Sequence, residues 1–109
     1  LVHRLLNRSR FMKFSTSPGI GAYNMLKADG FDDAIIGFAH TWSSGGFVVV
    51  YDASVILDTL TSRDEMSYEE ALEFFEFNIQ GAFVGDNSPI YMWPSDSQGI
   101  DELAEHFNE

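Results

Sequence analysis

Three glutamates form the densest group of side chains that could do chemistry. Glu69, Glu73 and Glu76 follow i, i+4, i+7 spacing, which places them on one face of a helix. Carboxylate oxygens are ligands for divalent cations, so such a ladder could collect one. Glutamates at this spacing more often form a solvated face, and we therefore predict no metal site and no cofactor.

A histidine offers the second candidate chemistry. His40 lies beside Trp42 in an apolar run that reads as a strand. A histidine acting as a general base needs a carboxylate or a nucleophile within reach, and Asp32, Asp33 and Asp52 are the candidates. The plainer interpretation is a packed histidine with a satisfied hydrogen bond. A small enzyme that uses His40 is therefore the least favoured hypothesis, and no catalytic residue is predicted.

The glutamates belong to the clearest helix of the chain, which is predicted over residues 67–84. Ser67 and Glu70 form the S-x-x-E capping box that satisfies free backbone N–H groups at a helix start. Gly81 and Gly85 are the candidate stops. A stripe of side chains is predicted to face the core: Tyr68, Ala71, Leu72, Phe75 and Ile79.

Phe77 does not obey this pattern, because it projects among the glutamates of the same helix. Burying a Phe contributes about 1.5–3 kcal/mol, so an aromatic ring on an acidic face requires a cover. Either another segment of the chain, such as the C-terminal helix, or another protein chain covers it. We predict a partner-binding surface composed of Phe77, Glu69, Glu73 and Glu76.

Two apolar runs predict a hairpin and a third predicts an edge strand. Residues 34–42 read as a strand whose successive side chains alternate between its two faces. Residues 47–51 (FVVVY) are apolar on both faces, which is typical of a central strand. Residues 89–93 form a short strand between two prolines, which favours an edge position. Ile90 and Trp93 on this edge are the second predicted partner-binding site, and Trp42 is expected in core or edge packing.

Helices complete the predicted α+β fold. They are expected over residues 22–28 and 53–62, with Asp52 capping the second, and after Ser97. The last helix carries an apolar stripe of Ile100, Leu103, Ala104 and Phe107. We predict a three-stranded antiparallel sheet, made of the 34–51 hairpin and strand 89–93, with helices packed on one face.

The charge distribution limits the classes of partner. The 109 residues carry a net charge of −11, and all 17 acidic residues follow position 28. A mainly acidic chain argues against direct nucleic-acid binding, which needs Lys and Arg. It has no cysteine, and no apolar run is long enough to span a membrane, so a cytoplasmic protein is expected.

The first eleven residues are unlike the remainder, because they are basic and precede the start-like Met12. One interpretation is that residues 1–11 are not native and come from an over-long gene prediction. The alternative is a basic amphipathic arm. In both cases we expect a poorly anchored segment at 1–11 and a single α+β domain at 12–109.

Four stretches between Gly30 and Trp93 carry a resemblance: GFDDAIIG, VVYDASVILDTL, RDEMSYEEALEFFEFNIQGAFVG and SPIYMW. They resemble small uncharacterised proteins encoded by phages and their bacterial hosts. The resemblance implies a phage or prophage origin and no particular activity or catalytic residue.

The leading functional hypothesis is a small acidic interaction or regulatory protein that binds another protein and forms a homo-oligomer. Its support is the acidity, the lack of a catalytic constellation in the sequence and the position of Phe77. The alternative is a DNA mimic that inhibits a nucleic-acid-binding protein, because dense carboxylates can imitate a polyanion.

Overall fold

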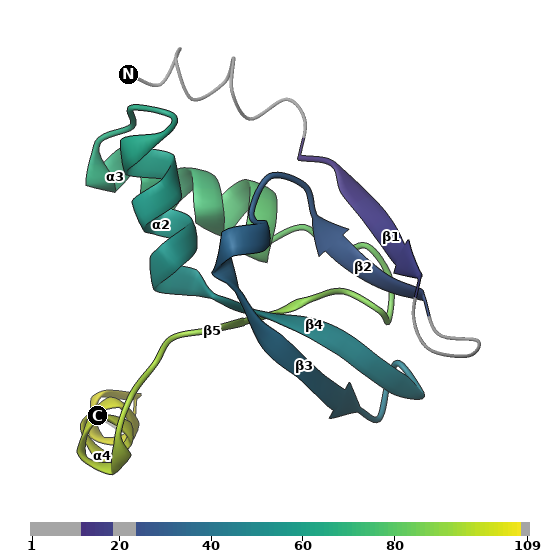
Figure 1. The fold of residues 1–109 in the computed structure, drawn as a ribbon. Coiled ribbons are helices and arrows are strands. Elements are labelled where there is room, and N and C mark those ends of the chain that lie inside the picture. Colours follow the sequence, from purple (N-terminus) through teal and green to yellow (C-terminus); the bar gives the residue numbers. More distant parts are fainter. Residues whose placement is uncertain (1–11, 19–23, 108–109) are drawn as a thin grey trace.

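The computed structural model describes residues 12–18 and 24–107, and within these ranges the chain has an α+β fold with two sheets and three α-helices (Figure 1). The predicted segment 1–11 lies outside the described residues. In chain order the strands are β1 (Phe14–Pro18), β2 (Asn24–Ala28), β3 (Ile35–Thr41), β4 (Gly46–Asp52) and β5 (Ile90–Met92). The helices are η1 (Asp32–Ala34, 3-10), α2 (Ala53–Ser62), α3 (Tyr68–Phe74), η2 (Phe75–Gln80, π) and α4 (Ser97–Phe107).

The larger sheet has the order β3-β4-β5 and is mixed. β3 and β4 form the predicted antiparallel hairpin, and β4 is the central strand, as its two-sided apolar sequence indicated. The prediction that the whole sheet is antiparallel is wrong, because β5 pairs with β4 in parallel. The chain leaves β4, forms two helices and returns, and such a crossover connection joins parallel strands.

A second sheet, which the sequence patterns did not predict, is the antiparallel ribbon β1–β2. Residues 22–28 were expected to form a helix, and this prediction is wrong for the described residues, which form β2. Tertiary contacts outweigh the weak strand propensity here. Ala28 is fully buried, and its backbone N–H donates to the hydroxyl oxygen of Tyr51 at 2.8 Å. β2 is thereby attached to the central strand.

The two helices of the crossover begin at the predicted caps. Asp52 accepts a hydrogen bond from the backbone N–H of Ser54 at 2.9 Å, and α2 buries Ala53, Ile56, Leu57 and Leu60. Ser67 and Glu70 form the predicted capping box, with the Glu70 carboxylate accepting from the Ser67 N–H at 2.8 Å. Local capping chemistry therefore determines both helix starts.

The main helix departs from a regular α-helix in its second half. It changes to a π-helix over Phe75–Gln80 and ends at Gly81, where a Cβ would clash with the carbonyl oxygen of Glu76. Phe75 and Ile79 are buried as predicted, but Tyr68 is exposed and Leu72 is only half-buried. The predicted stripe is displaced in the first half of the helix, because α3 buries Glu70, Ala71 and Phe74 rather than Tyr68 and Leu72.

The core lies between α2, the α3–η2 helix and the sheet. Tyr51 of β4 stacks on Tyr91 of β5 with ring centroids 5.7 Å apart. Phe75 meets the rings of Tyr91 and Trp93 edge-on, at 5.5 Å and 5.9 Å. These aromatic contacts join the crossover helix to the parallel edge of the sheet.

The C-terminal helix stands apart from this core. α4 buries none of its residues and extends away from the sheet beyond β5 (Figure 1). The prediction that the helices pack on one face of the sheet is therefore wrong for α4. Its cap is also one residue earlier than predicted, since the Asp96 side chain, rather than Ser97, accepts from the Gly99 N–H at 2.8 Å.

Candidate protein-interaction surface

The predicted surface around Phe77 is exposed. Glu69, Glu73 and Glu76 all face solvent, and the Phe77 side chain is 74% exposed. The expectation that the C-terminal helix or another segment covers Phe77 is wrong for the described residues, because neither α4 nor any other described element buries it. This surface consists of the aromatic ring of Phe77 on an acidic helix face. A partner that covers the ring would therefore also contact the carboxylates.

The glutamate ladder does not form a metal site in the part of the chain that the structure describes. No group of three or more His, Asp or Glu side chains there is arranged to hold a metal ion. The helix face spreads these carboxylates along its length, and each of them is open to solvent.

The edge-strand site is less accessible than the Phe77 surface. Ile90 is partly exposed, and Trp93 is 47% exposed because its ring packs edge-on against Phe75. Trp93 therefore has a structural contact of its own. The residues predicted from sequence thus lie in two separate places, the α3–η2 helix and the β5 edge.

His40 occupies neither a core nor a pocket. It is exposed on β3, where its ring lies edge-on to Trp42 at 6.0 Å and to Phe47 at 5.8 Å. The core or edge packing expected for Trp42 is wrong, because Trp42 lies in the hairpin turn with 94% of its surface exposed. The ring neighbours of His40 are aromatic side chains. This is not the environment of a general base, which would lie beside an aspartate.

Four residues of the hairpin form what we call the aromatic face: Phe38, His40, Trp42 and Phe47. His40 is paired directly with Phe47 across the strands, and Phe38 meets Phe47 edge-on at 5.2 Å. Phe38 is 66% exposed although it has an apolar ring. Cross-strand aromatic pairs stabilise a hairpin, but that role does not require rings as open as Phe38 and Trp42.

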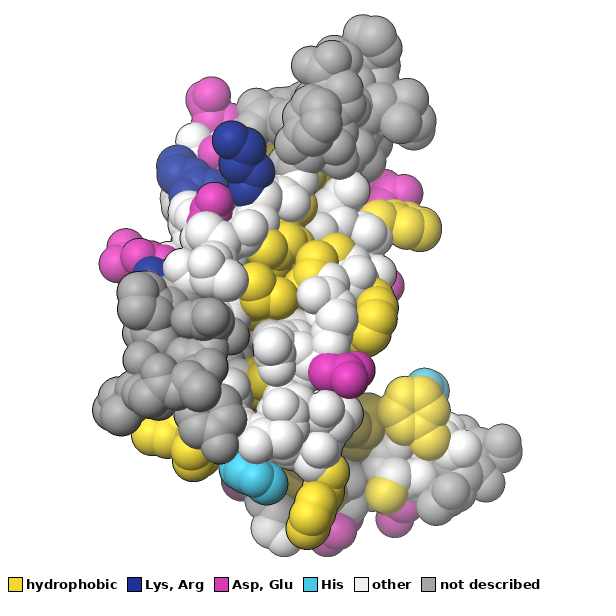
Figure 2. All heavy atoms as spheres, turned by 90° about the vertical axis from the view of Figure 1, so that its right-hand side faces the viewer, with side chains coloured by type: hydrophobic (Ala, Val, Ile, Leu, Met, Phe, Trp, Pro, Cys, Tyr) yellow, Lys and Arg dark blue, Asp and Glu magenta, His cyan; other side chains and the backbone are white. Residues whose placement is uncertain are grey.

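The strand pleat explains why these side chains gather on one surface. Successive residues of β3 alternate between half-buried and exposed, so Phe38 and His40 share the exposed face, with Ile36 before them. Figure 2 shows hydrophobic side chains beside a histidine at the lower end of the body. No Asp, Glu, Lys or Arg occurs between Ile35 and Tyr51, so the hairpin carries no formal charge except through His40.

A second exposed apolar surface lies on α4. The predicted stripe consists of Ile100, Leu103, Ala104 and Phe107, and we call its three large side chains, Ile100, Leu103 and Phe107, the α4 stripe. All three side chains are exposed, and Phe107 is 75% exposed. Acidic side chains, Asp101, Glu102 and Glu105, occupy other positions of the same helix. α4 is therefore an amphipathic helix whose apolar side has no cover within the described residues.

The structure also contains a cavity of about 400 Å³ between β1–β2 and the α2–α3 loop. Five apolar side chains line it: Met12, Phe31, Leu60, Met66 and Phe74. The other four lining residues are charged: Lys13, Asp29, Arg63 and Asp64. Neither His40 nor any of the predicted glutamates lines it. The catalytic hypothesis therefore gains nothing from this cavity.

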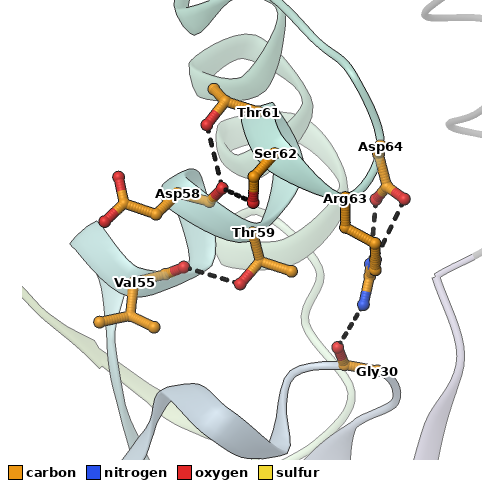
Figure 3. A network of polar contacts seen from close by, with 8 residues as sticks. All are labelled: Gly30, Val55, Asp58, Thr59, Thr61, Ser62, Arg63 and Asp64. Carbon is orange, nitrogen blue, oxygen red and sulfur yellow. Dashed lines mark hydrogen bonds and ion pairs between the residues drawn. The ribbon is translucent and has the colours of Figure 1, made fainter.

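Arg63 is the most prominent polar group of the cavity, and it has a structural role. Its guanidinium donates to the carbonyl oxygen of Gly30 at 2.6 Å and to both carboxylate oxygens of Asp64, at 3.1 Å and 2.9 Å (Figure 3). It also lies 5.0 Å from the centre of the Phe31 ring. Hydrogen bonding to Asp64 raises the pKa of Arg63 further. These contacts fasten the α2–α3 loop to the turn after β2.

Comparison with known proteins yields no relative. Neither the family models, nor the curated proteins, nor the solved structures match this chain. In the part of the chain that the structure describes, no helix has the length and apolar character needed to cross a membrane.

Sequence patterns did not identify the aromatic face or the α4 stripe as surfaces. The sequence did show which residues share a face, since the alternation of side chains along β3 and the spacing of the apolar residues of α4 were predicted correctly. The signal that could have identified the hairpin is its freedom from formal charge over residues 35–51 in an otherwise acidic chain. Charged residues are depleted at the centres of protein interfaces.

Proposed function

We propose that this chain is a small acidic protein-binding protein whose main binding surface is the aromatic face of the β3–β4 hairpin. The observation that carries the proposal is the exposure of Phe38 and Trp42 on a surface without formal charge. Exposed apolar patches on soluble domains mark interaction sites. Aromatic side chains, Trp above all, supply a large share of binding energy at interfaces.

The resemblance to phage-type proteins extends the proposal to the origin of the partner. A phage or prophage protein of this kind would act on a protein of the phage or of its bacterial host, in the cytoplasm of that cell. The lack of formal charge on the hairpin favours a partner with an apolar surface rather than a strongly basic one.

The exposed glutamates favour a second candidate function. Glu69, Glu73 and Glu76 present carboxylates beside Phe77, and this surface could engage a basic protein as a mimic of DNA. The two functions differ in their response to salt. Binding through carboxylates weakens as ionic strength rises, whereas binding through aromatic rings persists.

Affinity capture tests the proposal. Full-length protein on a solid support is exposed to a bacterial extract at low and at high salt, beside Phe38→Ser/Trp42→Ser and Phe77→Ser variants. We expect proteins retained by the wild type and by Phe77→Ser at both salt levels, and lost with the hairpin variant. Retention that ends at high salt and is insensitive to the hairpin substitutions would favour the mimic instead.

A further inference from the structure

We propose that α4 is an exchanged arm: its apolar stripe docks on the aromatic face of a second copy of this chain and forms a two-fold symmetric dimer. The inference rests on the proposed function, because it names the partner of the aromatic face. It differs from the oligomer predicted from sequence, which placed Phe77 or the β5 edge in the interface.

The first argument is that each surface lacks a cover among the described residues of its own chain. Every described residue of α4 after Gly99 is exposed, and so are Phe38 and Trp42 of the hairpin. An amphipathic helix that buries no side chain gains nothing from its apolar stripe as an isolated element. Laying the apolar side of a helix on an apolar protein surface is a common mode of recognition.

The second argument is electrostatic and selects the hairpin among the exposed apolar surfaces. α4 carries Asp101, Glu102 and Glu105, so it is repelled by acidic surfaces. Phe77 follows Glu76 directly and lies one turn after Glu73, and both carboxylates are exposed, so an acidic helix would meet like charges there. The aromatic face carries no carboxylate, and its one titratable group is His40. Docking there adds no like-charge contact from the hairpin itself.

The third argument is the direction of the arm. Met92, the last residue of β5, pairs with Asp52 at the end of β4, whereas Phe47 lies near the start of β4. Five residues along a strand correspond to about 16 Å. From Met92 the chain continues away from the hairpin turn, and α4 and the turn lie at opposite sides of the molecule (Figure 1). An arm that leads outward reaches a neighbour more directly than its own hairpin.

The fourth argument is the area. At roughly 150–250 Å² for a whole aromatic side chain, Phe38, Trp42 and Phe47 expose about 400 Å² together, and the α4 stripe exposes on the order of 300 Å². A two-fold axis makes each contact occur twice. If all of this area were covered, the two contacts would bury about 1,400 Å², which reaches the range of about 1,200–2,000 Å² for stable interfaces.

Sedimentation equilibrium on full-length protein, up to high micromolar concentration, tests the exchange. The arm variant is Leu103→Glu/Phe107→Glu, and the hairpin variant is Phe38→Ser/Trp42→Ser. All four residues are exposed, so circular dichroism should stay as in the wild type, and so should the melting temperature of dilute protein, where association is negligible. We expect a wild-type dimer that each double substitution weakens by at least about tenfold, while Phe77→Ser leaves it unchanged.

Mixing the two variants provides the decisive measurement. The arm variant retains an intact hairpin and the hairpin variant retains an intact α4, so one arm-to-hairpin contact can form between them. We expect a one-to-one heterodimer in the mixture, with a blue shift of Trp42 emission from the arm variant. Packing of hairpin on hairpin, or of α4 on α4, would not be restored by mixing, and a mixture that stays monomeric overturns the exchange.

The other outcomes separate this inference from the proposed function. A wild type that is monomeric at high micromolar concentration, including one whose α4 folds back on its own hairpin, overturns the dimer alone. An arm variant that still dimerises, beside a monomeric hairpin variant, retains the aromatic face as a protein-binding surface and removes α4 as its partner. A hairpin variant that dimerises like the wild type and also keeps every captured protein overturns both.

Discussion

Tyr51 and Tyr91 stack face to face across the parallel strand pair, with ring centroids 5.7 Å apart, yet only one of the two hydroxyl groups is hydrogen-bonded. The Tyr51 hydroxyl oxygen accepts from the Ala28 N–H at 2.8 Å. The buried Tyr91 hydroxyl has no partner among the residues that the structure describes. We therefore expect these two adjacent phenols of the same core to differ in their effect on stability.

The first prediction compares the two phenylalanine substitutions. Tyr51→Phe should lower the free energy of unfolding by about 1–3 kcal/mol, because it leaves the buried Ala28 N–H without an acceptor. Tyr91→Phe should leave that free energy unchanged or raise it, because it removes a buried hydroxyl that lacks a partner. Urea denaturation measures both, and equal losses would contradict the assigned hydrogen bonding.

The second prediction concerns alkaline pH. Burial raises the pKa of Tyr91 far above its ordinary value and also raises the pKa of Tyr51. Tyrosines of the unfolded chain ionise near pH 10, whereas the raised pKa values of the folded chain mean that both phenols lose their protons only at higher pH. The free energy of unfolding should therefore be unaffected below about pH 10 and fall as the pH rises above it.

Tyr91→Phe is the matched variant for the alkaline effect. It should flatten the decline of the urea midpoint above about pH 10, because one of the two phenols with a raised pKa is then absent. Tyr68→Phe is the control, since Tyr68 is exposed on the first turn of α3. A decline that is as steep in Tyr91→Phe as in the wild type would contradict the role of this phenol.

The third prediction distinguishes two positions of the main helix that its periodicity made equivalent. Phe75→Ala should cost about 3–5 kcal/mol, because the ring is fully buried against Tyr91 and Trp93. Leu72→Ala should cost less than about 2 kcal/mol, because Leu72 is only partly buried at the core boundary. Equal denaturation midpoints for the two variants would contradict the observed helix orientation.

The fourth prediction concerns the contact between Arg63 and Gly30. Arg63→Ala should lower the free energy of unfolding by about 1 kcal/mol, through the lost bond to the Gly30 carbonyl and the lost pairing with Asp64. Arg63→Lys should recover little of this, because an ammonium group cannot reproduce the planar fork. Lys27→Ala is the control, since its pairing with Asp32 at 3.2 Å is on the surface.

The fifth prediction concerns the contribution of Trp42 to the stability of the fold. Trp42→Ser should change the free energy of unfolding by less than about 0.5 kcal/mol, because the side chain is almost wholly in solvent. Thermal denaturation of the dilute protein, where association is negligible, gives this value. A large loss would mean that Trp42 supports the hairpin turn itself, and the capture experiment would then have to rely on Phe38→Ser.

The sequence by itself determined the elements whose signals are local. Asp52 and Ser67 are the N-caps of α2 and α3, as their side-chain chemistry indicated. Residues 47–51 belong to the central strand, as their two apolar faces indicated. The alternation of β3 and the stripe of α4 were also correct as patterns. Caps and periodicities depend on residues within one or two turns, so they can be read without the rest of the fold.

Only the tertiary structure decided which of these patterned faces are covered. Alternation shows that Phe38 and His40 share a side of β3, and helical spacing shows that Leu103 and Phe107 share a side of α4. Neither pattern shows what packs there, since burial depends on elements far away in the sequence. The parallel pairing of β5, the β1–β2 ribbon held by Tyr51 and the exposure of the aromatic face all follow from such long-range contacts.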